Sequence, residues 1–128
     1  MSVSNNVTTN SRFKSVNLRC DTDAAVETLY TCPNNCRSHM SMLHLVNAGG
    51  NVTVDIEFNR SAATQSALGV DASVHILGGK NMSTGDYIQF LGAVMVLEPG
   101  DTVTVTADGT TPTVDVIATL EEFFVVPG

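Results

Sequence analysis

The residues from Asn51 to Phe58 alternate between apolar and polar side chains without a fault. One face of this segment carries Val52, Val54, Ile56 and Phe58, and the other carries Thr53, Asp55 and Glu57. A period of two with one polar face predicts an antiparallel strand that is buried on one side only. Such a strand is not stable by itself, so the rest of the chain has to supply further strands and a second layer.

The residues before this strand predict two more strands, separated by tight turns. Residues 27–31 lead into the turn residues Cys32–Asn35, and a long apolar run from 37 to 46 ends at the turn 47–50. Proline, asparagine and glycine give both turns their backbone conformations.

The long apolar run does not alternate perfectly. Met40 and Met42 fall on one face of a regular strand, and Leu43 and Leu45 fall on the other. A one-residue bulge near Ser41 and Met42 would bring Met40, Leu43 and Leu45 to the same side. The alternative is a central strand that is covered on both faces, and the bulge is the favoured interpretation.

Short strands separated by turn signals are also predicted in the remaining chain, at residues 14–19, 74–77, 86–90, 93–97, 102–107 and 114–120. The clearest turn is Glu98–Asp101, where proline presets φ and glycine permits a positive φ. A turn is also expected at Gly78–Asn81, and residues 59–73 form a long connection that either contains a helical turn or contacts a partner. Eight or nine short strands predict an all-β fold, either an antiparallel β-sandwich or a jelly-roll-like barrel.

The length of 128 residues is that of one domain. Residues 1–13 are mostly serine, asparagine, threonine and valine without periodicity, so we expect a flexible N-terminal arm there and a single β-sandwich domain over 14–128. No apolar run is long enough to span a membrane, and the first residues lack the pattern of a secretion signal. We therefore expect assembly in a cytoplasm.

Charge is sparse and unevenly distributed. Only 15% of the residues are charged and the net charge is −7, but residues 1–20 contain Arg12, Lys14 and Arg19 and no acidic residue. An acidic body disfavours nucleic acid and anionic membranes as partners. The basic N-terminal end suits an acidic partner surface or a second copy. The low overall charge is typical of a surface that contacts other subunits, although a robust all-β monomer would share it.

Three short motifs carry a resemblance to a known family: Leu29–Pro33 (LYTCP), Leu43–Asn47 (LHLVN) and Leu97–Val103 (LEPGDTV). With them the chain resembles small β-sandwich virion structural proteins of tailed bacteriophages, notably phages of cyanobacteria, over about residues 27–120. The resemblance implies a head decoration or tail-associated subunit, and it carries no catalytic residues. Cys36 departs from the family pattern, in which a small polar residue is expected.

The cysteines allow three interpretations. Cys32 and Cys36 lie near His39 and His44, so two thiolates and two imidazoles are available for zinc, although their spacing is poor for that metal. A disulfide between Cys32 and Cys36 would leave Cys20 unpaired. In a protein made in the cytoplasm, three free cysteines at buried or half-buried positions are the default, and no cofactor or metal is expected.

No catalytic arrangement is recognisable in the sequence. The pairs Asp21/Asp23 and Glu121/Glu122 have no base or nucleophile near them in sequence, and we interpret them as solvated residues. No nucleophile elbow or phosphate-binding loop is present. We therefore expect a protein that is not an enzyme.

The favoured hypothesis is a bacteriophage capsid decoration or cement protein, located in the virion, with the major capsid protein or other virion subunits as partners. The alternative is a tail, neck or baseplate subunit. A third hypothesis, a module that binds host-surface carbohydrate, is weakened by an aromatic content of only 5%. A homo-oligomer is expected, with a trimer favoured. The candidate partner-binding residues are Arg12, Lys14, Arg19, Phe123 and Phe124.

Overall fold

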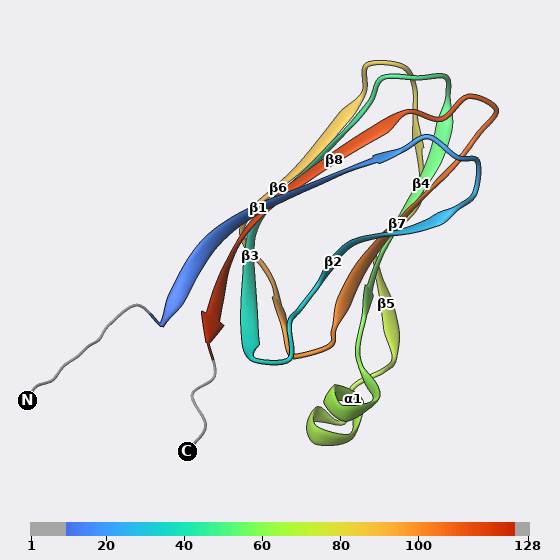
Figure 1. Ribbon diagram of the computed structural model, residues 1–128. Helices are drawn as coiled ribbons and strands as arrows, with labels where there is room; N and C mark the ends of the chain where they lie inside the picture. The colour runs from blue at the N-terminus through green and yellow to red at the C-terminus, as the bar shows by residue number, and fades with distance from the viewer. Residues whose placement is uncertain (1–9, 125–128) are drawn as a thin grey trace, which may run out of the picture.

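The computed structural model describes residues 10–124 (Figure 1). Eight strands and one short helix occur in this part of the chain. In chain order they are β1 (Ser11–Cys20), β2 (Val26–Thr31), β3 (Cys36–Asn47), β4 (Val52–Asn59), α1 (Ala62–Leu68), β5 (Ser73–Met82), β6 (Tyr87–Leu97), β7 (Thr102–Asp108) and β8 (Val114–Phe124). The predicted all-β class is confirmed.

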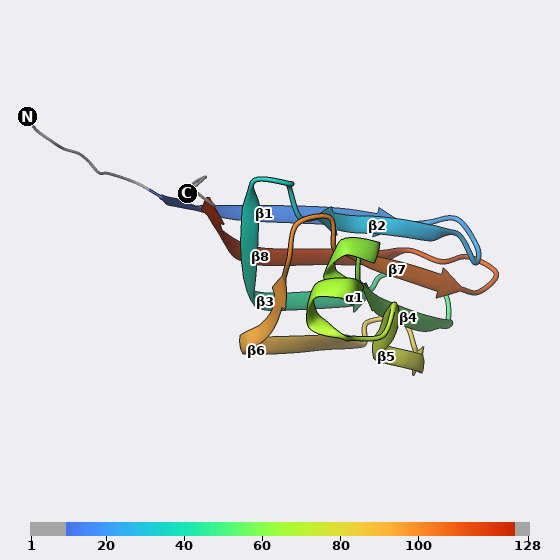
Figure 2. The same ribbon diagram turned by 90° about the horizontal axis from the view of Figure 1, so that it is seen from below.

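The strands form two four-stranded antiparallel sheets that face each other, as the view in Figure 2 shows. Sheet A has the order β1-β8-β3-β6, and sheet B has the order β2-β7-β4-β5. Successive strands alternate between the two sheets for most of the chain, which is the jelly-roll arrangement. The sequence left this choice open because hydrophobic alternation is the same in either topology.

The core lies between the two sheets and is built by the predicted alternation. In β4, Val54 and Ile56 are fully buried, whereas Asp55 and Glu57 are half-buried on the opposite side. In β8 the inward positions continue from Val114 through Val116, Ala118 and Leu120. β4 of sheet B and β8 of sheet A therefore contribute to one core, each through one face.

The predicted bulge in β3 is confirmed. The register of β3 shifts between Met40 and Met42 against both of its neighbours, β6 and β8. The extra residue brings Met40, Leu43 and Leu45 to the inside, where all three are buried. On β6 the same irregularity contains Gly92, whose φ of 92° favours glycine. The two strands that were predicted on either side of Gly92 are therefore one strand.

The turn predicted at Gly78–Asn81 is wrong, because β5 continues through these residues to Met82. Leu77 pairs with Ile56 and Lys80 pairs with Val54, so the glycine pair is accommodated as a bulge in the strand. Gly79 has a φ of 60°, and its N–H donates to the Asp55 carboxylate at 2.7 Å. Local glycine content was mistaken for a turn that the tertiary pairing does not need.

The predicted arm and connection boundaries are also revised. β1 begins at Ser11, so residues 11–13 belong to a paired strand and not to the arm that was placed at 1–13; residues 1–9 lie outside the described residues. The long connection after β4 contains the helical turn that was one of its two interpretations.

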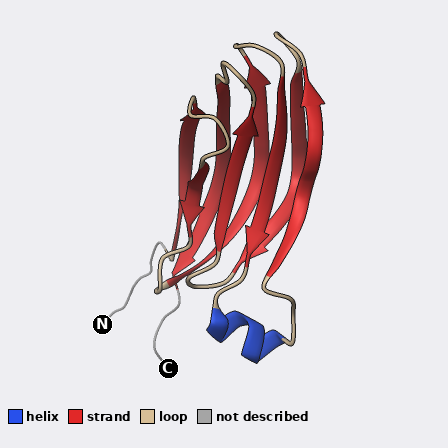
Figure 3. Ribbon diagram, turned by 90° about the vertical axis from the view of Figure 1, so that its right-hand side faces the viewer, coloured by secondary structure: helices blue, strands red, loops and turns tan. Residues whose placement is uncertain are grey.

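Helix α1 lies at one end of the sandwich, beyond the strands (Figure 3). The Ser61 hydroxyl accepts a hydrogen bond from the Thr64 N–H at 3.1 Å, which caps the start of the helix. Gly69, with a φ of 66°, ends it, and its N–H donates to the Gln65 carbonyl at 2.9 Å. We call this end of the molecule, which also holds Asn10, Phe124 and the 98–101 turn, the helix end.

Candidate interaction surfaces

A buried ionic cluster lies at the helix end of sheet A, around Glu122. Glu122 continues the inward series of β8, and none of its side chain is exposed. Its carboxylate accepts hydrogen bonds from the Tyr30 hydroxyl of sheet B and, at 2.6 Å, from Arg12 Nε of β1. Lys14 Nζ lies 3.7 Å away. The cluster thus connects β1 and β8 to the opposite sheet.

The groups around Glu122 determine its ionisation state. Burial would raise the pKa of Glu122, but the hydrogen bonds from Tyr30 and Arg12 and the charge of Lys14 outweigh burial and hold its pKa below the ordinary value. Burial and the bond to Glu122 raise the pKa of Tyr30 well above its usual range. Glu122 therefore stays ionised and Tyr30 stays protonated at neutral pH, as a structural contact between the sheets requires.

The cluster extends to two buried polar residues beside Tyr30. The Tyr30 and Ser38 hydroxyls are 2.7 Å apart, and Cys32 Sγ lies 3.3 Å from Ser38 Oγ. Burial raises the pKa of the Cys32 and Cys36 thiols, and it raises that of Cys20 to about 12. All three cysteines are free and buried, which agrees with the prediction of three free cysteines at buried or half-buried positions. Thiols with raised pKa values are poor nucleophiles at neutral pH.

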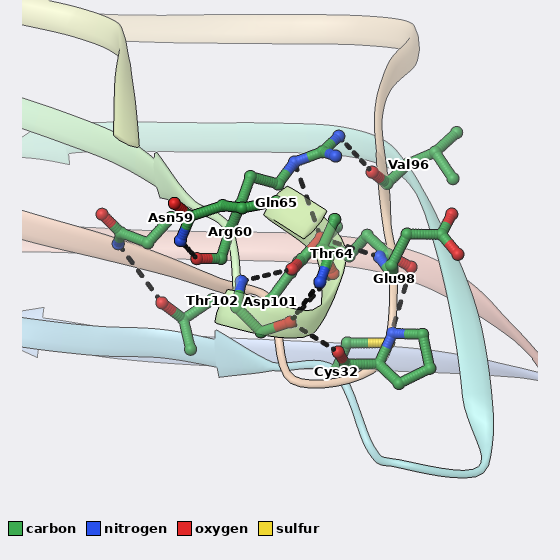
Figure 4. Close-up of polar contacts among 12 residues, drawn as sticks. Cys32, Asn59, Arg60, Thr64, Gln65, Val96, Glu98, Asp101 and Thr102 are labelled. Carbon is green, nitrogen blue, oxygen red and sulfur yellow. Dashed lines mark hydrogen bonds and ion pairs between the residues drawn. The ribbon is translucent and has the colours of Figure 1, made fainter. Parts of the chain in front are cut away.

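A second buried carboxylate, Asp101, organises the connections at the helix end (Figure 4). Its two oxygens accept hydrogen bonds from the N–H of Ser61 at 2.8 Å and of Glu98 at 2.9 Å. Arg60 Nε lies 3.5 Å from the same carboxylate, and the Asp101 carbonyl accepts the Cys32 N–H at 2.8 Å. One aspartate therefore joins the β2–β3, β4–α1 and β6–β7 connections.

The five predicted partner-binding residues are divided between three places. Arg12, Lys14 and Phe124 lie together, with the Arg12 guanidinium 5.3 Å from the centre of the Phe124 ring. Arg19 lies at the other end of β1, where Nε is 2.7 Å from Asp115 Oδ1. Phe123 points away from the core, and its ring lies 4.7 Å from that of His39. The structure thus gives the three basic residues partners within the chain.

The outward side of sheet A carries a row of apolar and aromatic side chains that crosses all four strands. We call it the apolar face; it consists of Phe13, Met42, Val46, Tyr87, Leu91, Val96, Ile117 and Phe123. Phe13, Leu91 and Tyr87 are the most exposed of these, at 84%, 69% and 68%. Exposed apolar patches of this kind mark protein contact sites in soluble proteins.

The apolar face is hollowed at the end away from the helix. A groove of about 490 Å³ is lined there by Asn17, Leu18, Arg19, His44, Val46, Asp115, Val116 and Ile117. The Arg19–Asp115 ion pair forms its polar border, and His44 stands 5.9 Å from the Tyr87 ring, measured between ring centres. Nδ1 of His44 is buried without a hydrogen-bond partner among the described residues.

Sequence reasoning missed Asp101 and the apolar face, and its interpretation of Glu122 as a solvated residue is wrong, because that side chain is fully buried. The signal for Glu122 was available, because the period of two that runs through Val114, Val116, Ala118 and Leu120 puts residue 122 on the inside. Asp101 was recognised only as a turn residue.

Among residues 10–124, no three His, Cys, Asp or Glu side chains are grouped as metal ligands. No helix in that range is long and apolar enough to cross a membrane.

No protein-family model and no curated protein matches this chain. Among solved structures, a chain of the Bacillus endospore appendages, which form disulfide-linked pili, is similar with a TM-score of 0.55, 15% identity and 98% coverage of both chains. Capsid chains of the Helicobacter pylori bacteriophage KHP30 and of cyanophage Pam1 each give 11% identity. Their TM-scores are 0.42 and 0.38; the alignments cover 94% and 97% of this chain and 92% and 93% of theirs.

The likeness to the appendage chain extends over the whole length of both molecules, so the two share a fold. At 15% identity it establishes the fold alone. The two phage scores are too low to support an argument about either fold or function.

Proposed function

We propose that this chain is a non-enzymatic structural subunit of a bacteriophage particle, and specifically a decoration or cement protein on the capsid. The observation that carries the proposal is the apolar face. A monomer gains nothing from presenting Phe13, Tyr87 and Leu91 to water, whereas a subunit that is held in an assembly buries them against a neighbour.

The buried polar groups support the same role. Glu122 and Asp101 both direct their oxygens at donors inside the chain, so their hydrogen bonds stabilise the fold. The LYTCP and LEPGDTV motifs, on which the resemblance to phage virion proteins rests, meet at two backbone hydrogen bonds: the Cys32 N–H donates to the Asp101 carbonyl, and the Gly100 N–H donates to the Cys32 carbonyl. They thus form one structural unit of the fold.

The N-terminal segment is proposed as a second point of attachment. Residues 1–9 lie outside the described residues, and they precede an edge strand whose Phe13 is 84% exposed. An extended segment that leaves an edge strand can add to a neighbouring sheet through backbone hydrogen bonds. Because Arg12, Lys14 and Arg19 already have acidic partners in the chain, the attraction of this segment for a partner comes mainly from its backbone and Phe13.

The test is a count of this chain in purified particles of the phage that encodes it, measured by quantitative mass spectrometry against the major capsid protein. A constant ratio that fits the capsid symmetry, with density on the outside of the head, is expected. Absence from the particle would overturn the proposal. A shorter chain without residues 1–9 should fold with an unchanged melting temperature but bind capsids more weakly. Equal binding would show that residues 1–9 do not contribute to attachment.

A second candidate is a subunit of a tail, neck or baseplate. It is favoured by the shared fold with the appendage chain, because that chain belongs to an extended assembly and not to a shell. The same count decides between the two, since a tail subunit would be present in far fewer copies than the capsid protein and would be absent from the heads.

A further inference from the structure

We propose that the apolar face is a contact between two copies of this chain, related by a two-fold axis, in which Phe13 of each copy lies in the groove of the other. This inference concerns the free protein, so it can fail while the proposed role in the virion stands, and the reverse is equally true.

The shape of the face suits a second copy. Phe13 is the most exposed large apolar side chain in the described chain, at 84%, and it projects from the helix end of β1. The groove that involves Asn17 and Arg19 lies at the opposite end of the same strand and opens on the same side of sheet A. A protrusion and a hollow on one face, at opposite ends of one strand, are self-complementary.

A two-fold axis that lies in the plane of the face and runs perpendicular to the strands brings Phe13 of one copy to the groove of the other. Such an axis keeps each strand above its counterpart and exchanges the two ends. Placed between Ser15 and Val16, at the middle of β1 (Ser11–Cys20), it carries Phe13 of one copy over the backbone of Leu18 of the other, between the outward side chains of Asn17 and Arg19. Leu18 lines the groove. Sheets that stack face to face in this way pack about 10 Å apart, the spacing that interdigitating side chains require.

Charges agree with the same pairing. Arg19 is at the groove end, and its side chain is 63% exposed although it pairs with Asp115. At the other end, Glu121 lies opposite Phe13 in the β1–β8 register and has no cationic partner among the described residues; one of its oxygens accepts the Ser11 hydroxyl at 2.8 Å. The two-fold axis places Arg19 of each copy above the Phe13–Glu121 end of the other. Two ion pairs therefore form across the contact.

The face is large enough for a stable contact. Four strands of about ten residues cover roughly 600 Å² in projection, at about 4.8 Å between strands and about 3.3 Å per residue. The side chains protrude, so their accessible area is larger and approaches the roughly 800 Å² per partner of a standard protein interface. This pairing predicts a dimer as the smallest assembly, in place of the trimer that the sequence suggested.

The first experiment measures the mass of the full-length chain by light scattering and sedimentation, from low to high micromolar concentration. A concentration-dependent dimer is expected. The variant Phe13→Asp should weaken dimerisation about 10-fold or more, as for a central contact residue. The matched control is Val26→Asp, which changes another exposed apolar residue, 70% exposed on the edge of sheet B, and should leave the dimer intact.

A charge exchange tests the two-fold geometry separately. Arg19→Glu should weaken the dimer, and so should Glu121→Arg, while the double variant should regain much of the lost affinity. Within one chain the two positions lie at opposite ends of the β1–β8 pair, so a recovery has to come through the partner copy. Circular dichroism confirms that each variant is folded.

A monomer at all concentrations, a trimer, a dimer that Phe13→Asp leaves unchanged, or a double variant that is no better than the two single ones would each overturn the proposal.

Discussion

The outward side of sheet B is mainly threonine, aspartate, glutamate and asparagine, whereas the outward side of sheet A carries leucine, valine, isoleucine and aromatic residues among its polar ones. We call the outward side of sheet B the polar face; its main residues are Thr28, Thr53, Asp55, Glu57, Asn59, His75, Thr102, Thr104 and Thr106. Both faces cover the same core and both are open to solvent in the single chain. Folding therefore does not require them to differ, and the proposed contact on sheet A would account for the difference.

The two sheets also differ in what they hold beneath their outer faces. The interior of sheet B is apolar along β4 and β7, whereas sheet A places Glu122 inside, beneath β1. Arg12 and Lys14 reach this carboxylate from an edge strand that pairs only with β8 within its sheet. Sheet A thus holds one ionic cluster at the end of an otherwise apolar interior, and it carries the apolar face on its outer side.

The largest expected effect tests whether sheet B has one inward and one outward side. Ile56→Ala should lower the free energy of unfolding by about 2–5 kcal/mol, because Ile56 is fully buried between the sheets. Glu57→Ala, its neighbour on the polar face, should stay within about ±0.5 kcal/mol. Denaturant melts measure both, and equal effects would contradict the assignment of faces.

A smaller loss is expected for the contact between the two sheets at Glu122. Tyr30→Phe removes the hydroxyl that donates to Glu122 and is 2.7 Å from Ser38 Oγ, and leaves a buried carboxylate with one donor fewer. It should lower the free energy of unfolding by about 1–3 kcal/mol. Tyr87→Phe, which removes the hydroxyl of an exposed tyrosine, is the control and should have little effect on the same melt. If the two variants were equally stable, the Glu122 cluster would not connect the sheets.

The same cluster predicts a pH dependence. The pKa of Glu122 is lowered from its ordinary value of 4.5 in the folded chain, so its contribution to stability is complete above that pH and is lost as the pH falls through the lowered value. The stability difference between the parent protein and Glu122→Gln should therefore be largest at neutral pH and should shrink below about pH 4.5. A difference that stays constant from neutral to acid pH would show that the ionised carboxylate is not what stabilises the cluster.

The smallest effect on folding is expected from changes to the outer faces. Leu91→Thr gives the apolar face the chemistry of the polar face, and it should change the free energy of unfolding by no more than about 0.5 kcal/mol because Leu91 is exposed. Its expected effect is on self-association and on binding of a hydrophobic dye, both of which should fall. Thr104→Ser on the polar face should change neither. A large loss of stability in Leu91→Thr would mean that the apolar face belongs to the fold and not to a contact.

The amino-acid sequence predicts the inside of this fold better than its outside. The alternation of apolar and polar residues predicts β4, β7 and β8 and their inward residues, and its interruption around Met42 predicts the bulge of β3. This is possible because a strand with one buried face has apolar residues at every second position. The turn predicted at Gly78–Asn81 is wrong because a glycine pair occurs both in turns and in strand bulges, so the local sequence does not distinguish them. Only the partner strand, through Lys80 opposite Val54, decides between them.

The candidate contact site was predicted only in part. Phe123 was selected as an apolar terminal residue, and it does lie on the apolar face. The other members come from four strands that are distant in the sequence, such as Phe13, Leu91 and Ile117, and only the strand order of sheet A brings them together. Arg12 and Lys14 were selected for their charge, but their main partner, Glu122, lies some 110 residues further along the chain.

The most direct measurement of the central claim is oxidative footprinting of the full-length chain at low and at high concentration, read out residue by residue by mass spectrometry. If the apolar face is the contact surface, Phe13, Tyr87 and Leu91 should become protected as the concentration rises. Val26 and His75 on the other sheet should be modified equally at both concentrations. Protection of Val26 and His75 with unchanged modification of Phe13 and Tyr87 would contradict the account, because the polar face would then be the one that meets a neighbour.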